Sequence, residues 1–368
     1  MRVILTIVLT ACGVACPQTS WAHPNPEAEC VQAASSGWTR QEAWVWRQLC
    51  HGEQATLNSR SIGGKAPTPT LQDEWTPERG LRAVFLEAIL EQKFYADHLA
   101  NRSVSIAGAW YQDSLHFEDA VITNSVYLKD SRFESEVTFI NASPLRNIGF
   151  QGSAFKEGLD MNSVEVGGSV LLRAGANFQG LDLRGAQVGG NIDARGSTFH
   201  GELDMNHVDV GMSVTINNGN YQKVDLAGAI VGGAIDASGS TFHEQLDMNS
   251  VEVGRAVHIR GGADCQIVDL ISAKVGGNID ASGSTFHGRL DLSIAQVGGH
   301  VHATGAVFRS DLDMSEARID GSILATKQLK ETKQTEVHRL DANNAEIAGV
   351  VDISGAIVSD AVDLSGVM

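Results

Sequence analysis

The sequence predicts a mainly β protein, a right-handed parallel β-helix with four-sided coils that follows a small α-helical region. Three observations predict this fold: a repeat of 22 residues, two similar halves within each repeat, and recurring Gly-Gly pairs. A Leu-Asp or Val-Asp pair opens each repeat, and successive pairs lie 22 residues apart except for one step of 21. The pairs begin at Leu159, Leu181, Leu203, Val224, Leu246, Val268, Leu290 and Leu312.

Apolar residues occupy the same positions in every repeat. The third position holds Leu or Met, the eighth holds Val or Ile, and one position of the second half is mostly aromatic. This aromatic column consists of Phe178, Phe199, Tyr221, Phe242, Cys265, Phe286 and Phe308. Apolar residues five and six positions apart fit neither an amphipathic helix nor one long alternating strand. They fit short strands separated by corners, whose core each coil completes only with its neighbours.

Gly-Gly pairs recur at one corner of the repeat, as in Gly167-Gly168 and Gly189-Gly190. We expect this corner to be a tight turn that requires positive φ. Parallel strands stack about 4.8 Å apart, so equivalent residues should form ladders along the axis.

These repeats resemble those of the pentapeptide-repeat proteins. The family's A-(D/N)-L-x-x unit is approached by the five residues from Leu181 and by the five from Ala186, and the resemblance covers roughly residues 104–364. The repeats here alternate five residues with six. The resemblance implies a quadrilateral solenoid, in which Asp or Asn often follows the first core position.

The N-terminus predicts export. Residues 1–22 read as a signal peptide, with Arg2 before an apolar run and a small-x-small cleavage site that ends at Ala22. The alternative is a lipoprotein signal, because Leu-Thr-Ala precedes Cys12. No other stretch approaches the roughly 20 apolar residues that cross a bilayer. We therefore expect a periplasmic or secreted protein with no transmembrane segment, or one anchored by lipid at Cys12.

Residues 23–52 predict a helical hairpin. Its second helix should begin at Thr39, with Glu42 completing a capping box. Cys30 and Cys50 lie one on each helix, so we expect a disulfide between them in an oxidising compartment.

A polar, Gly- and Pro-containing stretch at residues 53–75 reads as a linker, and residues 76–103 as a helix that caps the first coil. The expected apolar face of this helix comprises Leu81, Val84, Phe85, Ala88 and Ile89.

The solenoid should then occupy residues 104–368, interrupted by a loop insertion at 326–339. The insertion carries Lys327, Lys330 and Lys333, and loops on rigid scaffolds often carry function. No sequence after Val362 is expected to cover the last coil, so a homodimer through the C-terminal coils is expected.

An unbroken column of aspartates follows the first core position. It consists of Asp160, Asp182, Asp204, Asp225, Asp247, Asp269, Asp291 and Asp313. Carboxylates one strand spacing apart repel, so they either fan into solvent or hold divalent cations or a basic partner. Together with the three lysines of the insertion they form the candidate binding surface.

A net charge of −17 argues against nucleic acid as a partner. Histidines such as His200 and His243 recur only every second coil, too far apart to share one metal ion, and catalytic and cofactor motifs are missing. We therefore expect a non-enzymatic scaffold or protein-interaction surface of the cell envelope, without a cofactor. The alternatives are an exported carbohydrate-active β-helix enzyme or carbohydrate-binding protein, and, for a cytoplasmic protein, a DNA mimic of the pentapeptide-repeat type.

Overall fold

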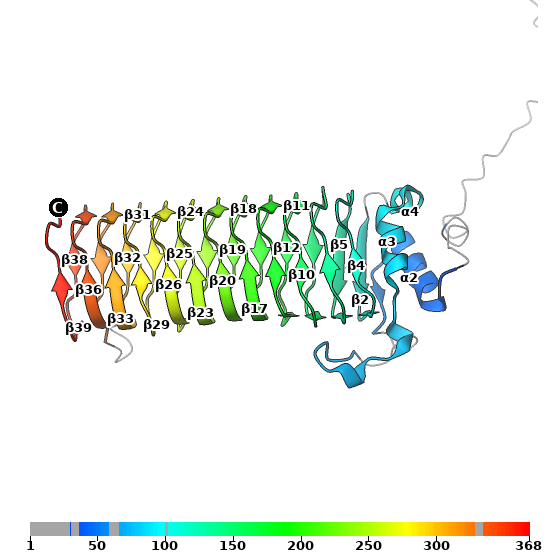
Figure 1. Ribbon diagram of the computed structural model, residues 1–368, viewed down its shortest axis with the longest axis horizontal. Helices are drawn as coiled ribbons and strands as arrows, with labels where there is room; N and C mark the ends of the chain where they lie inside the picture. The colour runs from blue at the N-terminus through cyan, green and yellow to red at the C-terminus, as the bar shows by residue number, and fades with distance from the viewer. Residues whose placement is uncertain (1–29, 31–36, 59–65, 100–101, 328–333) are drawn as a thin grey trace, which may run out of the picture.

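The computed structural model describes residues 30, 37–58, 66–99, 102–327 and 334–368. They form an elongated β-solenoid of about 12 coils with three helices at its N-terminal end (Figure 1). The predicted mainly β solenoid is confirmed. The predicted signal peptide and Cys12 lie outside the described residues.

Each coil has four faces. One face is a parallel sheet of 13 strands and a second face is a parallel sheet of nine, while the other two share a sheet of 18. That sheet covers two faces because strands such as β17 (Thr198–Asp204) continue across the corner between them. The 13-stranded sheet contains β1 (Ala55–Thr56), β2 (Ser103–Ala107), β5 (Ser125–Lys129), β8 (Ile148–Gly149), β12 (Val170–Leu171), β16 (Ile192–Asp193), β19 (Val214–Thr215), β22 (Ile235–Asp236), β25 (Val257–His258), β28 (Ile279–Asp280), β32 (Val301–His302), β35 (Ile323–Leu324) and β38 (Val351–Asp352). The nine-stranded sheet contains β11 (Glu165–Val166), β15 (Gln187–Val188), β18 (Asp209–Val210), β21 (Ile230–Val231), β24 (Glu252–Val253), β27 (Lys274–Val275), β31 (Gln296–Val297), β34 (Arg318–Ile319) and β37 (Glu346–Ile347).

The aromatic column lies in the core, as predicted. Its rings stack coil upon coil, with centroids 4.7 Å apart for Phe178 and Phe199 and 4.9 Å apart for Phe286 and Phe308. Cys265 is buried in the same column, and burial raises the pKa of its thiol. Cys265 is therefore part of the apolar core.

The serine of the Ser-Thr-Phe-His sequence is buried and connects successive coils. Ser240 donates a hydrogen bond to the Ile216 carbonyl at 2.6 Å and accepts one from the Gly219 N–H at 3.0 Å. The hydroxyl therefore links its own coil to the preceding one. Ser153 makes the same bridge, because it donates to the Leu128 carbonyl at 2.7 Å and accepts from the Ser131 N–H at 3.0 Å.

The sequence analysis gave the wrong reason for glycine at the Gly-Gly corners. These glycines do not have positive φ; a Cβ on Gly189 would lie 2.4 Å from the Gly167 carbonyl oxygen of the preceding coil. Close approach of stacked backbones therefore requires glycine there. Positive φ occurs at two other positions of each coil, for example Ser163 (55°) and Ala174 (67°).

Ile294 occupies one of these left-handed positions, with φ of 59° and a side chain that is 53% exposed. A β-branched residue is strained in this conformation, by about 1 to 2 kcal/mol. We expect Ile294→Asn to raise the free energy of unfolding by about 1 kcal/mol, measured by urea denaturation. The control, Ser272→Asn at the equivalent position one coil earlier, should change it by less than about 0.5 kcal/mol. Destabilisation by Ile294→Asn would contradict the strain.

The helical region before the repeats, with α2 (Arg40–Cys50), α3 (Ala83–Glu91) and α4 (Lys93–His98), is called the head below. It begins with α2, whose capping box between Thr39 and Glu42 is confirmed. The predicted disulfide between Cys30 and Cys50 is also present. Trp46 donates its indole N–H to the Cys30 carbonyl at 2.9 Å, which ties the disulfide to the helix. The first helix of the expected hairpin lies outside the described residues.

The expected capping helix is shorter and divided. The chain forms a 3-10 turn, η2 (Pro77–Arg79), then α3 (Ala83–Glu91) and α4 (Lys93–His98). The helix starts late because Gly80 and Leu81 pair with the edge of the first coil, where the Leu81 N–H donates to the Trp110 carbonyl at 3.1 Å. Val84 is 60% exposed, against the prediction, while Leu86 and Leu90 complete the buried face. This face covers the first coil, as predicted (Figure 1).

The predicted linker is partly structured. Its residues Ala55 and Thr56 form β1, which pairs in parallel with Ile106 and Ala107 of β2. Ala55 is fully buried, so this segment adds a rung to the solenoid. Later residues form η1 (Gln72–Glu74). None of the helices in the described part of the chain is both long and apolar enough to cross a membrane.

Candidate functional site

The predicted aspartate column is real and in register. Its members end β10 (Leu159–Asp160), β14 (Leu181–Asp182), β17, β20 (Asn220–Asp225), β23 (Thr241–Asp247), β26 (Asp264–Asp269), β30 (Leu290–Asp291) and β33 (Val307–Asp313). Each aspartate pairs with the aspartate of the next coil, as Asp160 does with Asp182 and Asp182 with Asp204. The structure thus brings all eight together on one face.

These carboxylates accept hydrogen bonds from other groups of the same chain. In seven of the eight, one oxygen accepts a hydrogen bond from the backbone N–H two residues later, for example from Asn162 to Asp160 at 2.9 Å and from Ala227 to Asp225 at 2.8 Å. The bond closes the turn before the left-handed residue. Asp269 is the exception and accepts from Gln245 and Arg289. Seven aspartates of the column therefore stabilise the corner of their own coil, a role that the sequence interpretation missed.

Arginines neutralise part of the column. Arg184 donates to Asp182 at 2.9 Å, and Arg289 lies within 3.3 Å of both Asp269 and Asp291. Burial would raise the pKa of Asp182, but hydrogen bonds from Arg184 hold it below its usual value. Asp204 differs, because burial and the charges of Asp182 and Asp225 raise its pKa. Within the described residues, no group of three or more His, Cys, Asp or Glu side chains could hold a metal ion.

A second aspartate column of the same chemistry lies on the 13-stranded sheet, and the sequence interpretation did not single it out. Its members include Asp193, Asp236 and Asp280, each of which accepts from the backbone N–H two residues later at 3.0 to 3.4 Å. The signal was present in the half-repeat, as an apolar-Asp pair before a left-handed turn.

The histidines bond to neighbouring coils. His243 lies 2.6 Å from the Asn220 side chain and His287 lies 2.8 Å from Asp264. Lys327 of the insertion is exposed, whereas Lys330 and Lys333 lie outside the described residues. The chain rejoins the solenoid at Thr335, whose hydroxyl accepts from the Gly305 N–H at 2.8 Å. The insertion therefore leaves the coil intact.

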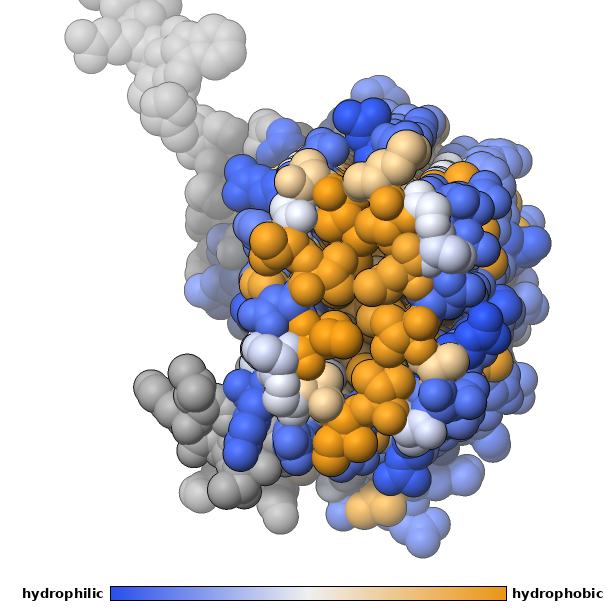
Figure 2. All heavy atoms as spheres, turned by 90° about the vertical axis from the view of Figure 1, so that its left-hand side faces the viewer, coloured by the Kyte–Doolittle hydropathy of each residue, from blue (hydrophilic) through white to orange (hydrophobic). Residues whose placement is uncertain are grey.

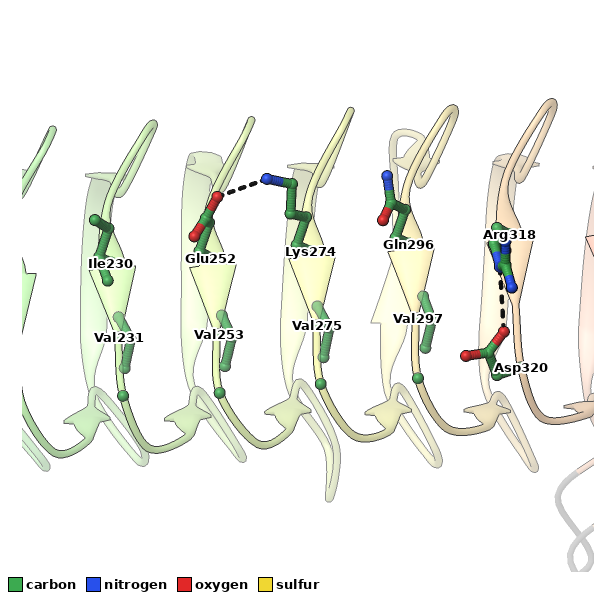
Figure 3. A pocket seen from close by; sticks show the side chains of 14 residues that line it. Ile230, Val231, Glu252, Val253, Lys274, Val275, Gln296, Val297, Arg318 and Asp320 are labelled. Carbon is green, nitrogen blue, oxygen red and sulfur yellow. Dashed lines mark hydrogen bonds and ion pairs between the residues drawn. The ribbon is translucent and has the colours of Figure 1, made fainter.

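A shallow groove of about 450 Å³ crosses β21, β24, β27, β31 and β34 (Figure 3). Valines and corner glycines form its floor, and the outward side chains of these strands form a ridge beside it. At about 4.8 Å per coil the groove extends roughly 19 Å along the axis. Its charges are paired, Lys274 with Glu252 at 2.7 Å and Arg318 with Asp320 at 3.3 Å. The groove is thus shallow, and each charged side chain that lines it is paired with another.

The end face of the last described coil is apolar. This coil contains β38, β39 (Ile357–Val358) and β40 (Val362–Asp363). β36 (Glu336–Asp341) lies in the preceding coil and pairs with β39 and β40. Figure 2 shows a continuous hydrophobic area at this end, bordered by hydrophilic residues. The exposed large hydrophobic residues of the last coil are Val350 (63%), Ile357 (49%), Val362 (38%), Leu364 (41%) and Met368 (78%). A contiguous patch of this kind marks an interaction surface more often than scattered apolar residues do.

Comparison of the chain with protein-family models, with curated proteins and with solved structures found no match. The resemblance to pentapeptide-repeat proteins therefore remains a hypothesis.

Proposed function

We propose that this protein is an exported, non-enzymatic scaffold of the cell envelope that binds another protein through the apolar end face of its last described coil. The observation that carries the proposal is the apolar end face in Figure 2. At the other end of the solenoid, by contrast, α3 packs on the first coil and covers its apolar residues. The disulfide between Cys30 and Cys50 favours an oxidising compartment, in agreement with the predicted leader. The hydrogen-bonded corners give the solenoid the rigidity of a scaffold.

Fractionation of cells that express the full chain, followed by affinity capture, tests this function. We expect the protein outside the cytoplasm, and an envelope protein captured by the wild type should be lost with the double variant Ile357→Asp and Leu364→Asp. The control carries the same charges at Val121 and Ile230, which are exposed on the sides of the solenoid. Cytoplasmic protein, or identical capture by both double variants, would contradict the proposal.

A further inference from the structure

The ridge beside the groove continues along the whole nine-stranded sheet. Each of the nine strands contributes its first residue, and all nine side chains are exposed. In chain order the ridge consists of Glu165, Gln187, Asp209, Ile230, Glu252, Lys274, Gln296, Arg318 and Glu346. One residue follows the next at about 4.8 Å per coil, and Figure 3 shows the middle part of this row. The order of charges along the ridge therefore decides which surface can lie against it.

The ridge is complementary to itself when a second copy runs in the opposite direction. A two-fold axis that passes between β24 and β27 places Glu252 of one copy opposite Lys274 of the other. The same axis places Asp209 opposite Arg318. Every other opposed pair of ridge positions includes at least one uncharged residue. Opposite charges therefore meet along the contact, and like charges do not.

A shift of one coil in either direction removes this match. It would place Glu252 opposite Glu252 of the other copy, or Lys274 opposite Lys274. Like charges about 4 to 5 Å apart repel by about 1 kcal/mol in water. The charges of the ridge thus disfavour both neighbouring registers.

The charged side chains of the ridge can turn to a facing copy. Within the chain Lys274 pairs with Glu252 and Arg318 pairs with Asp320, but these four side chains are between 51% and 64% exposed. Such exposed pairs contribute only about 0 to 1 kcal/mol, so a facing opposite charge competes with them. The corner glycines beside the ridge carry no side chain and leave room for the long side chains of the other copy.

We propose that two copies of this chain associate side by side and antiparallel through their nine-stranded sheets. The contact lies on the side of the solenoid and not at the C-terminal coils, where the sequence predicted a homodimer. It leaves the apolar end face of each copy uncovered, and the two end faces then point in opposite directions. The inference goes beyond the proposed function and does not depend on it.

Reversal of two charges that lie five coils apart tests the inference. Asp209 and Arg318 are roughly 24 Å apart along one solenoid, so they can pair only between copies. In sedimentation velocity we expect a dimer for the full chain, and association at least about tenfold weaker for Asp209→Arg and for Arg318→Asp. An equal mixture of the two variants should restore the dimer, because opposite charges face each other again. Both changes in one chain should restore it for the same reason.

The matched controls, Glu244→Arg and Arg309→Asp, make the same reversals at exposed positions of β23 and β33 and should leave the dimer unchanged. Circular dichroism checks the fold of each variant. A wild-type chain that stays monomeric at every concentration would overturn the inference. A dimer that both reversals leave intact, as a contact through the C-terminal coils would, and weakened association that mixing does not restore would also overturn it. None of these results bears on capture by the end face, which is measured separately.

Discussion

Replacement of Phe242 by Ala should cost about 3 to 5 kcal/mol of unfolding free energy. Phe242 is 1% exposed, stacks on Tyr221 with ring centroids 5.4 Å apart, and pairs through its backbone with Cys265 of the next coil. Cys265 is already the smallest member of the column. A second small residue beside it would leave a cavity across two coils that the close-packed neighbours fill only in part.

Equilibrium urea denaturation followed by circular dichroism measures this loss. The control on the same strand, Glu244→Ala, removes an exposed side chain and should change the unfolding free energy by less than about 0.5 kcal/mol. Equal losses in the two variants would mean that the aromatic column does not support the core. In a solenoid each coil is stabilised mainly by its neighbours, so the loss should be greatest in β23 and the strands beside it.

The sequence pattern predicted the solenoid well because its core depends on period. Leu181 and Phe199 recur in columns, and residues in register must stack when identical coils are joined by parallel strands. The corners were harder to predict. Glycine satisfies both a positive φ and a close backbone approach, and only the distance from Gly189 to the Gly167 carbonyl separates the two reasons.

The sequence predicted where the aspartates of the candidate site lie, but it did not predict what their carboxylates do. The repeat placed Asp160 and its equivalents on one face, but the hydrogen bond from the residue two positions later is a property of the turn. Asp193 has the same bond in the other half of the repeat.

The head contains no repeat. Its helix boundaries therefore depend both on local sequence signals and on tertiary contacts, which the sequence does not reveal. The capping box at Thr39 was predicted correctly because it depends on residues three positions apart. The start of α3 was not, because the edge of the first coil binds Gly80 and Leu81 before the helix can begin. The contact that joins α2 to the segment before α3 is an ion pair between Glu42 and Arg82, which lie 40 residues apart.

Glu42→Gln should destabilise the head by about 2 to 3 kcal/mol at neutral pH. Glu42 is fully buried and accepts hydrogen bonds from the Thr39 N–H at 2.7 Å and from the Arg82 side chain at 2.6 and 2.9 Å. Hydrogen bonds to a charged group contribute about 1.5 to 3 kcal/mol, and loss of one partner leaves the other without its counter-charge. Hydrogen exchange of the α2 amides should therefore accelerate roughly 30- to 150-fold, with little change in β23.

The dependence on pH gives a second test of the same ion pair. Burial would raise the pKa of Glu42, but the hydrogen bonds from Arg82 and Thr39 hold it below its usual value of 4.5. A carboxylate with a lowered pKa in the folded state contributes stability that is fully present above its unfolded pKa and is lost as the pH falls through the folded value. The difference in α2 exchange between the wild type and Glu42→Gln should thus be constant near pH 7 and shrink below pH 4.5. Glu53→Gln, an exposed change just after α2, serves as the control and should match the wild type at every pH. A difference that stays the same from pH 7 to pH 3 would show that the carboxylate charge does not hold the head together.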